Sequence, residues 1–207
     1  KEFASFSKKM RHYGLAEPDV HFNNVLQEVN DAVLERSEQL EEHLQKIIQL
    51  RPDSFRFLKG SARLLSSSEV EVKSDSGKHK VFAENIIIAT GSRPRKLPYI
   101  AIDEDIIMTS DGISSLEEFP ESLVIIGAGV IGCEFATIFS NFRKTKVHLI
   151  SKDDRILPFE DADLAKVIES NLETNGVLIH RESNLEKMVI ADGEVEYVLE
   201  HPDGKRE

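Results

Sequence analysis

A glycine-rich segment in the second half of the chain has the GxGxxG spacing of loops that bind the pyrophosphate of a dinucleotide, and it reads Gly127-Ala128-Gly129-Val130-Ile131-Gly132. Glycine turns that bind nothing can share this spacing, so the neighbouring sequence has to decide. The apolar run Leu123–Ile126 directly precedes the segment and predicts a buried strand, and Val130–Phe142 predicts a helix after it. This order of strand, glycine turn and helix favours the dinucleotide interpretation.

In such a loop the glycines have different tasks. Gly127 permits the tight turn out of the strand, and Gly129 lets the backbone approach the pyrophosphate. Gly132 lets the helix lie close to the strand. The pyrophosphate would lie at the start of the helix, where backbone N–H groups have no partner within the helix.

The adenosine ribose would meet the end of the next strand, predicted over Lys146–Ile150, where dinucleotide folds usually place an acidic residue. Here Ser151 follows the strand, and a serine cannot accept two ribose hydroxyls as a carboxylate does. It fits a 2′-phosphate better, and Lys152 could supply the opposite charge. Asp153 and Asp154 would repel a phosphate. On the sequence, the choice between NAD and NADP stays open.

The elements that must position these residues alternate after residue 121, which predicts a doubly wound, Rossmann-like parallel α/β sheet followed by a β-meander. Strands are expected over 123–126, 146–150, 177–180, 185–190 and 194–200, and helices over 130–142 and 161–174. The sequence His201–Lys205 then predicts a turn. Since the sequence stops three residues after Gly204, we expect no returning strand and interpret it as a fragment of a longer protein.

The first half has a different pattern. A periodic apolar stripe predicts a long helix over 19–50, ended by Pro52. Short strands are expected over 62–65, 69–73 and 78–82. The uniformly apolar Ile86–Ala89 predicts a strand buried on both faces inside a parallel sheet, and residues 95–120 are expected to be an irregular connection between domains.

The composition argues against several other classes of function. Lys and Arg total 26 against 37 Asp and Glu, and the net charge of −11 argues against nucleic acids and anionic membranes as partners. The longest nearly apolar run, Leu123–Cys133, is too short to cross a bilayer, and with no signal peptide in view we expect a cytoplasmic protein. The single cysteine, Cys133, excludes an internal disulfide, and the histidines show no pairing typical of metal ligands.

Three segments in the same order resemble the pyridine nucleotide–disulfide oxidoreductases, and among them dihydrolipoyl dehydrogenases and soluble pyridine nucleotide transhydrogenases: Ile86–Pro98, Val124–Glu134 and Asp154–Pro158. The resemblance covers about Phe22 to Glu207. It implies FAD and NAD(P) as cofactors, with hydride transfer between NAD(P)H and FAD, and a homodimeric parent whose disulfide or small-molecule electron acceptor is unknown. It also implies that residues 1–50 are a helical segment of an FAD-binding domain, 51–118 its C-terminal part, and 119–207 an NAD(P)-binding domain truncated at its C-terminus.

The resemblance also implies roles for single residues. It places Thr90, Gly91 and Ser92 in a sharp turn beside the FAD, and Gly60 and Ala62 beside the adenine of the flavin.

On the nicotinamide side, Gly127–Gly132 matches the family's dinucleotide loop. Glu134 matches a glutamate near the nicotinamide ring and the flavin, with an exposed glutamate near the start of a helix as the alternative. Leu185 matches a position whose backbone approaches the adenine.

The sequence also departs from the family. A first GxGxxG, the redox-active cysteine pair and the C-terminal domain with its catalytic histidine are absent, and Cys133 inside the predicted helix is expected to be a small packing residue. We therefore expect hydride transfer in the parent and little activity in this chain alone. A stand-alone, non-catalytic dinucleotide-binding module is the alternative.

Overall fold

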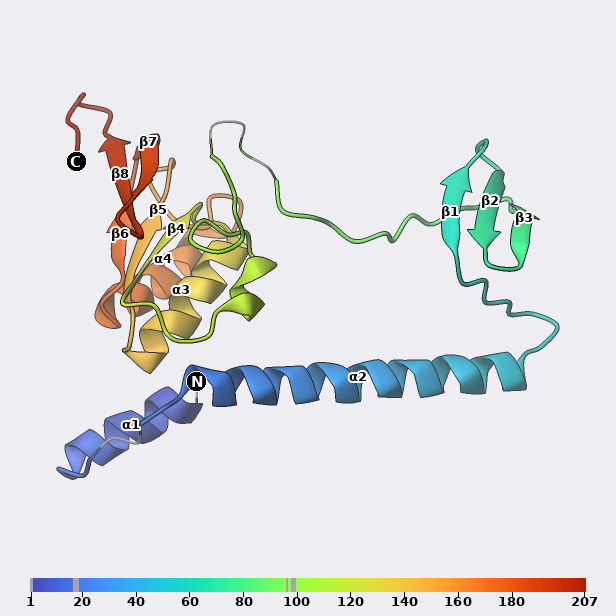
Figure 1. Ribbon diagram of the computed structural model, residues 1–207, viewed down its shortest axis with the longest axis horizontal. Coiled ribbons are helices and arrows are strands. Elements are labelled where there is room, and N and C mark those ends of the chain that lie inside the picture. Colours follow the sequence, from blue (N-terminus) through green and yellow to red (C-terminus); the bar gives the residue numbers. More distant parts are fainter. Residues whose placement is uncertain (1, 17–18, 96, 98–99) are drawn as a thin grey trace. The chain divides into compact units, whose positions relative to one another are not determined.

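The computed structural model describes residues 2–16, 19–95, 97 and 100–207 (Figure 1). The chain forms two compact units, one comprising residues up to Gln27 and from Pro94 to Glu207, the other Glu28–Arg93. The first unit contains the predicted nucleotide loop and is the one that positions the candidate site. The domain boundaries expected at residues 50 and 118 remain a prediction.

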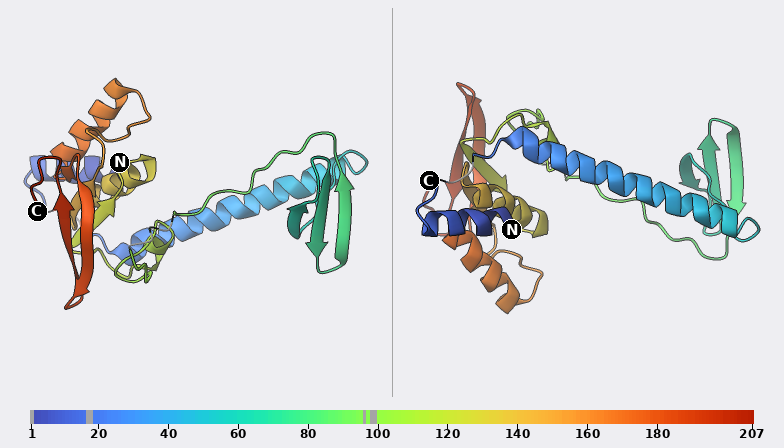
Figure 2. Two further views of the ribbon diagram at one scale, coloured as in Figure 1. Left: turned by 90° about the horizontal axis from the view of Figure 1, so that it is seen from above. Right: turned by 90° about the horizontal axis from the view of Figure 1, so that it is seen from below.

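The long helix and the three short strands expected in the first half of the chain are confirmed. The long helix α2, Phe22–Leu50, begins in the first unit and continues into the second without interruption (Figure 2). It ends just before Pro52, which cannot continue a helix. The strands β1 (Ser61–Leu64), β2 (Glu69–Ser74) and β3 (Gly77–Phe82) then form an antiparallel sheet in that order.

The prediction of a buried strand over Ile86–Ala89 is wrong. The segment has no regular secondary structure, and the side chains of Ile87 and Ile88 are 91% and 68% exposed. A strand that is apolar on both faces needs neighbouring strands and a covering layer. No strand of the described residues pairs with this segment, so its side chains stay in solvent.

A parallel sheet organises the first unit, as the sequence predicts. Its strands β4 (Ser122–Ile126), β5 (Lys146–Ile150) and β6 (Leu178–His180) lie in that order, with β4 at an edge. The helix α3 (Val130–Phe142) connects β4 to β5, and α4 (Ala162–Thr174) connects β5 to β6. Because β4 is paired on one side only, it is half-buried rather than fully buried as expected.

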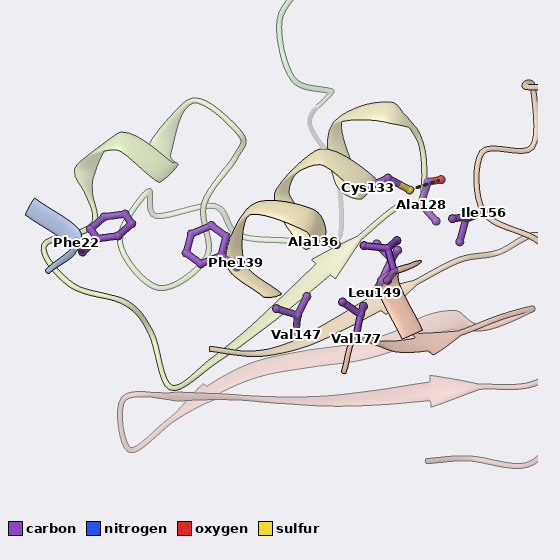
Figure 3. Packing of buried hydrophobic residues seen from close by; sticks show 10 residues of the cluster. Phe22, Ala128, Cys133, Ala136, Phe139, Val147, Leu149, Ile156 and Val177 are labelled. Atoms are coloured by element: carbon purple, nitrogen blue, oxygen red, sulfur yellow. Dashed lines mark hydrogen bonds between the residues drawn. The ribbon is translucent and has the colours of Figure 1, made fainter. Parts of the chain in front are cut away.

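The core lies between this sheet and α3. Val147 and Leu149 on β5 are buried against Ala136 and Phe139 on α3, as Figure 3 shows. Phe22, at the start of α2, stacks on Phe139 at a ring-centroid distance of 6.2 Å. This packing fixes α3, and with it the glycine loop at its start, relative to β4 and β5.

An antiparallel hairpin follows the sheet, formed by β7 (Asn184–Ala191) and β8 (Glu194–Glu200). The expected turn is present, with the His201 N–H donating to the Lys205 carbonyl. The chain then returns far enough for Leu199 and Glu207 to exchange two backbone hydrogen bonds, around an isolated bridge between Glu200 and Arg206. The described residues contain no strand after β8.

The helix α1, Glu2–His12, lies within the segment 1–50 that the resemblance implies to be helical, although no residue pattern gave its bounds. The 3-10 turn η1, Gly112–Ser115, was not expected. No helix of the described residues has both the length and the apolar character needed to cross a bilayer.

Asp161 fixes the beginning of α4. Its carboxylate accepts the backbone N–H groups of Asp163 and Leu164 at 3.0 and 3.3 Å, which are otherwise unpaired at a helix start. Asp161→Ala should therefore reduce the free energy of unfolding by about 1 kcal/mol. Urea denaturation measures this, with Asp163→Ala as a control that removes a charge from the same helix end and no capping bond. Equal losses in the two variants would contradict a capping role.

Candidate dinucleotide-binding site

The glycine loop lies between β4 and α3, as the sequence predicts. Gly127 has φ of +107°, a conformation that favours glycine over every residue with a side chain. Its N–H donates to the carbonyl of Ile150 at 3.0 Å, which joins the loop to the end of β5. The chain therefore turns sharply out of β4 at the carboxyl edge of the sheet.

Gly132 and Gly129 have opposite surroundings. A Cβ atom on Gly132 would lie 2.0 Å from the backbone oxygen of Gly127, so only glycine lets α3 approach the strand this closely. A Cβ atom on Gly129 would meet no protein atom within 4 Å, although its φ of −78° would suit any residue. Protein packing therefore explains why residue 132 is a glycine. At residue 129 the protein itself would tolerate a side chain, and a glycine there keeps the space next to the loop open.

The start of α3 offers hydrogen-bond donors to that space. Gly129 is the N-cap residue, no side chain caps the helix, and its first turn has no acidic residue. The first N–H groups of a helix carry a partial positive charge and commonly bind phosphate. The residues present therefore fit the pyrophosphate of a dinucleotide.

A second loop, residues 151–160, supports the glycine loop from the end of β5. The Leu157 N–H donates to the Ala128 carbonyl at 2.8 Å, and the thiol of Cys133 lies 3.6 Å from the same oxygen. Ile156 is completely buried beside Ala128 (Figure 3). These contacts hold the middle of the glycine loop in one orientation.

The support loop adopts a conformation that costs free energy. Leu157 has φ of +49°, which is uncommon for a residue with a side chain. The Arg155 guanidinium stabilises this turn by donating to the carbonyls of Pro158 at 2.7 Å and Glu160 at 3.1 Å. Sequence reasoning found neither the turn nor its contact with Ala128, because both depend on tertiary packing.

A cavity of about 1010 Å³ opens beside the glycine loop. Gly127, Gly129 and Gly132 line it together with β4, the segment around 100–110, His148 on β5 and the hairpin. Asp103 shapes the part of the wall formed by Asp105, Ile106 and Ile107, because its carboxylate accepts their N–H groups at 2.8–3.0 Å. These hydrogen bonds lower the pKa of Asp103. The sequence analysis missed this wall, whose only local signal is an aspartate in an irregular segment.

For the other residues proposed for the nicotinamide side, the structure gives a position and an exposure but no contact that points to a cofactor. Glu134 is exposed and lies one residue beyond the first turn of α3, and Leu185 is half-buried in β7. Lys152 is exposed, whereas Ser151 is only 2% exposed and its hydroxyl donates to the Arg155 carbonyl. Ala128 is buried, and Val130 and Ile131 are exposed at the cavity. Cofactor contacts for these residues stay predictions.

The residues proposed for FAD lie in the second unit. A Cβ atom on Gly60 would lie 2.5 Å from the Lys73 oxygen, so packing on β2 accounts for this glycine without a flavin. Ala62 pairs with Val72 in the β1–β2 ladder. Residues 90–92 (Thr90, Gly91 and Ser92) are exposed and irregular, and no hydrogen bond of the described residues joins them to β1. The flavin roles of these residues stay predictions.

Cys133 is a buried packing residue, as the sequence predicts. It is 4% exposed within the core cluster. Burial, with a smaller contribution from the charge of Glu169, raises the pKa of the thiol to about 11. A thiol that stays protonated at neutral pH is a poor nucleophile, so Cys133 is not suited to redox chemistry.

A pair of histidines connects the sheet to the hairpin. His148 Nδ1 lies 3.0 Å from His180 Nε2 and 3.4 Å from the hydroxyl of Tyr197 on β8. Burial, followed by the charges of His180 and Lys146, lowers the pKa of His148. His148 therefore takes up a proton at a lower pH in the folded protein than in the unfolded chain, where histidine titrates near pH 6.5.

We expect stability to fall as the pH drops from about 7 through the lowered pKa of His148, because the contribution of neutral His148 is present only above that range. In His148→Gln the free energy of unfolding should fall less steeply with decreasing pH. The difference in slope should correspond to the uptake of a fraction of one proton on unfolding. Urea titrations at several pH values measure the slope. His43→Gln, an exposed histidine on α2, is the control, and identical slopes in both variants would refute the expectation.

Comparison with known proteins shows the family to which the chain belongs. A family model described as pyridine nucleotide-disulphide oxidoreductase matches residues 3–206. The dihydrolipoyl dehydrogenase of Bacillus subtilis is 38% identical over 136 residues, which are 66% of this chain and 30% of that protein. The soluble pyridine nucleotide transhydrogenase of Hahella chejuensis is 33% identical over 212 residues, covering 100% of this chain and 43% of that protein.

Solved structures show the same fold. LpdA from Mycobacterium tuberculosis aligns with a TM-score of 0.78 at 21% identity, over 99% of this chain and 44% of that one. A disulfide reductase from Escherichia coli, the flavoprotein RclA, aligns with a TM-score of 0.70 at 26% identity, over 90% of this chain and 41% of that one. The chain thus spans less than half the length of these proteins. It belongs to the pyridine nucleotide-disulphide oxidoreductase family.

Proposed function

We propose that residues 119–207 bind the adenosine and pyrophosphate groups of NAD(P)H in a flavin-dependent oxidoreductase similar to dihydrolipoyl dehydrogenase. Members of the family bind FAD and NAD(P)H. The two cofactors together supply hydride transfer between the nicotinamide and the flavin. The observation that carries the proposal is the contrast between Gly132, where packing excludes a side chain, and Gly129, where only open space beside helix N–H groups explains the glycine.

The residues of this chain would bind and orient the dinucleotide. The N–H groups at the start of α3 would donate to the pyrophosphate, and the Leu157 N–H would hold the loop in place through the Ala128 carbonyl. The segment that Asp103 holds in place would line the same cavity beside the bound dinucleotide. No redox step is assigned to Cys133, because its thiol is buried and protonated.

A soluble NAD(P) transhydrogenase is a second candidate for the activity of the whole protein. The relative with that name aligns with all of this chain, whereas the dihydrolipoyl dehydrogenase aligns with 66% of it. The two candidates share the dinucleotide site and differ in the electron acceptor.

Titration of the purified protein with NADH, followed by the fluorescence of the nicotinamide, tests the binding proposal. Binding should saturate, and ADP-ribose should compete because it carries the adenosine and pyrophosphate groups. Nicotinamide mononucleotide should compete poorly. Competition by nicotinamide mononucleotide alone would refute the assignment of this loop to the pyrophosphate.

The visible spectrum tests the flavin expectation. Because Thr90–Ser92 are exposed and not joined to β1, the purified chain should be colourless or nearly so and should not turn over lipoamide. Flavin absorbance close to one equivalent, or measured turnover with lipoamide, would contradict this expectation. A colourless protein that binds NADH would match the non-catalytic module that the sequence also allows.

A further inference from the structure

The end of β5 decides which groups can meet the adenosine ribose of a bound dinucleotide. Ser151 is the residue at that position in the sequence, but its hydroxyl points into the protein. It donates to the Arg155 carbonyl at 3.2 Å and accepts the Asp153 N–H at 3.3 Å. With 2% of its surface exposed, Ser151 has no hydrogen bond to offer a ribose or a phosphate.

Both arginines near this edge have their guanidinium groups engaged inside the protein. Arg155 donates to the carbonyls of Pro158 and Glu160, which closes the support loop. Arg181, just after β6, forms ion pairs with Glu169 and Glu173 on α4. A 2′-phosphate is usually bound by an arginine at this edge, and neither arginine is free for that task.

Among the described residues, Lys152 directly follows the end of β5 as a cation without an ion-pair partner, and two carboxylates come after it. Asp153 and Asp154 are both exposed, and their carboxylates have no hydrogen-bond or ion-pair partner among the described residues. A phosphate dianion placed here would meet one positive and two negative side chains. The local charge therefore opposes NADP(H).

Asp153 is held at the edge from both sides. Its N–H donates to the Ser151 hydroxyl, and its carbonyl accepts the Glu182 N–H at 3.0 Å. The Ser151 carbonyl in turn accepts the Ser183 N–H at 2.8 Å. The ends of two strands thus fix the backbone of Asp153 and leave its carboxylate in solvent. A free carboxylate is the group that accepts the two hydroxyls of an unphosphorylated ribose in dinucleotide folds.

We propose that this protein selects NAD(H) over NADP(H), an inference that rests on the proposed dinucleotide site. Asp153, not Ser151, is the residue that determines the choice. Ser151 is a positioning residue that acts through the backbone of Asp153. The sequence alone leaves the choice open because it does not show which polar side chains are already engaged.

Parallel fluorescence titrations with NADH and NADPH test the selection. At low ionic strength NADH should bind at least about tenfold more tightly, because charge repulsion is least screened there. Raising the salt concentration to about 0.5 M should narrow the ratio, which a purely steric exclusion of the phosphate would not do. Equal or tighter binding of NADPH would overturn the selection while leaving the proposed function intact. Failure of both dinucleotides to bind would remove the proposed function itself.

Three matched variants test which residue determines the selection. Asp153→Asn should weaken NADH binding and strengthen NADPH binding, so the ratio of their dissociation constants falls by roughly tenfold. Asp75→Asn, in the turn between β2 and β3, removes the same charge in the other unit and should leave the ratio unchanged. A larger change of the ratio in Asp154→Asn than in Asp153→Asn would overturn the assignment to Asp153.

Discussion

Gly129→Ala is expected to fold like the wild type and to bind NADH more than about tenfold less tightly, a loss of about 1.4 kcal/mol or more. The backbone of Gly129, with φ of −78° and ψ of −172°, is extended and allowed for alanine. The added methyl group would meet no protein atom within 4 Å. It would instead occupy the space through which a pyrophosphate approaches the N–H groups of α3. Alanine is a poorer N-cap residue than glycine, so stability should fall by less than about 1 kcal/mol.

The measurement pairs NADH and ADP-ribose titrations with urea denaturation of the same samples. Both ligands carry the pyrophosphate, so both should lose affinity to a similar extent. AMP lacks the second phosphate and should lose less. Unchanged NADH affinity in a variant shown to be folded would mean that the pyrophosphate does not lie against Gly129, and the proposed site would have to be abandoned.

The sequence predicts best those elements whose pattern is local. The helix over Val130–Phe142 and the strand over Lys146–Ile150 have the predicted bounds, because the apolar pattern defines both and Gly129 marks the start of the helix. The tasks of Gly127 and Gly132 also follow from the motif, and the φ of +107° and the 2.0 Å approach agree with them.

The sequence fails where the outcome depends on distant partners. Ile86–Ala89 has the composition of a buried strand, but a strand forms only with neighbours to pair with, and the described residues provide none. Ser151 follows β5 as expected, yet its hydroxyl turns inward because the loop offers it the Arg155 carbonyl and the Asp153 N–H. The left-handed turn at Leu157 is held by contacts with Ala128 that no local pattern announces.

Gly132→Ala is expected to lower the free energy of unfolding of the first unit by about 3 kcal/mol, the upper part of the range for overpacking a close-packed site. On an unconstrained helix the same substitution stabilises by about 1 kcal/mol, so propensity alone predicts the opposite sign. Here the new Cβ would lie 2.0 Å from the Gly127 oxygen, a backbone atom fixed by its position between β4 and the loop. The helix α3 can relieve this contact only by moving away from β4, which also loosens the core around Ala136 and Phe139.

Urea denaturation followed by circular dichroism measures this loss, and Thr137→Ala, on the exposed side of the same helix, is the matched control with little expected change. The two glycine variants separate stability from binding. Gly129→Ala should affect NADH affinity with nearly normal stability, whereas Gly132→Ala should affect stability first and binding through the displaced loop. A Gly132→Ala protein as stable as the wild type would show that α3 does not pack against the glycine loop. A Cβ atom 2.0 Å from a backbone oxygen cannot be accommodated while that packing is kept.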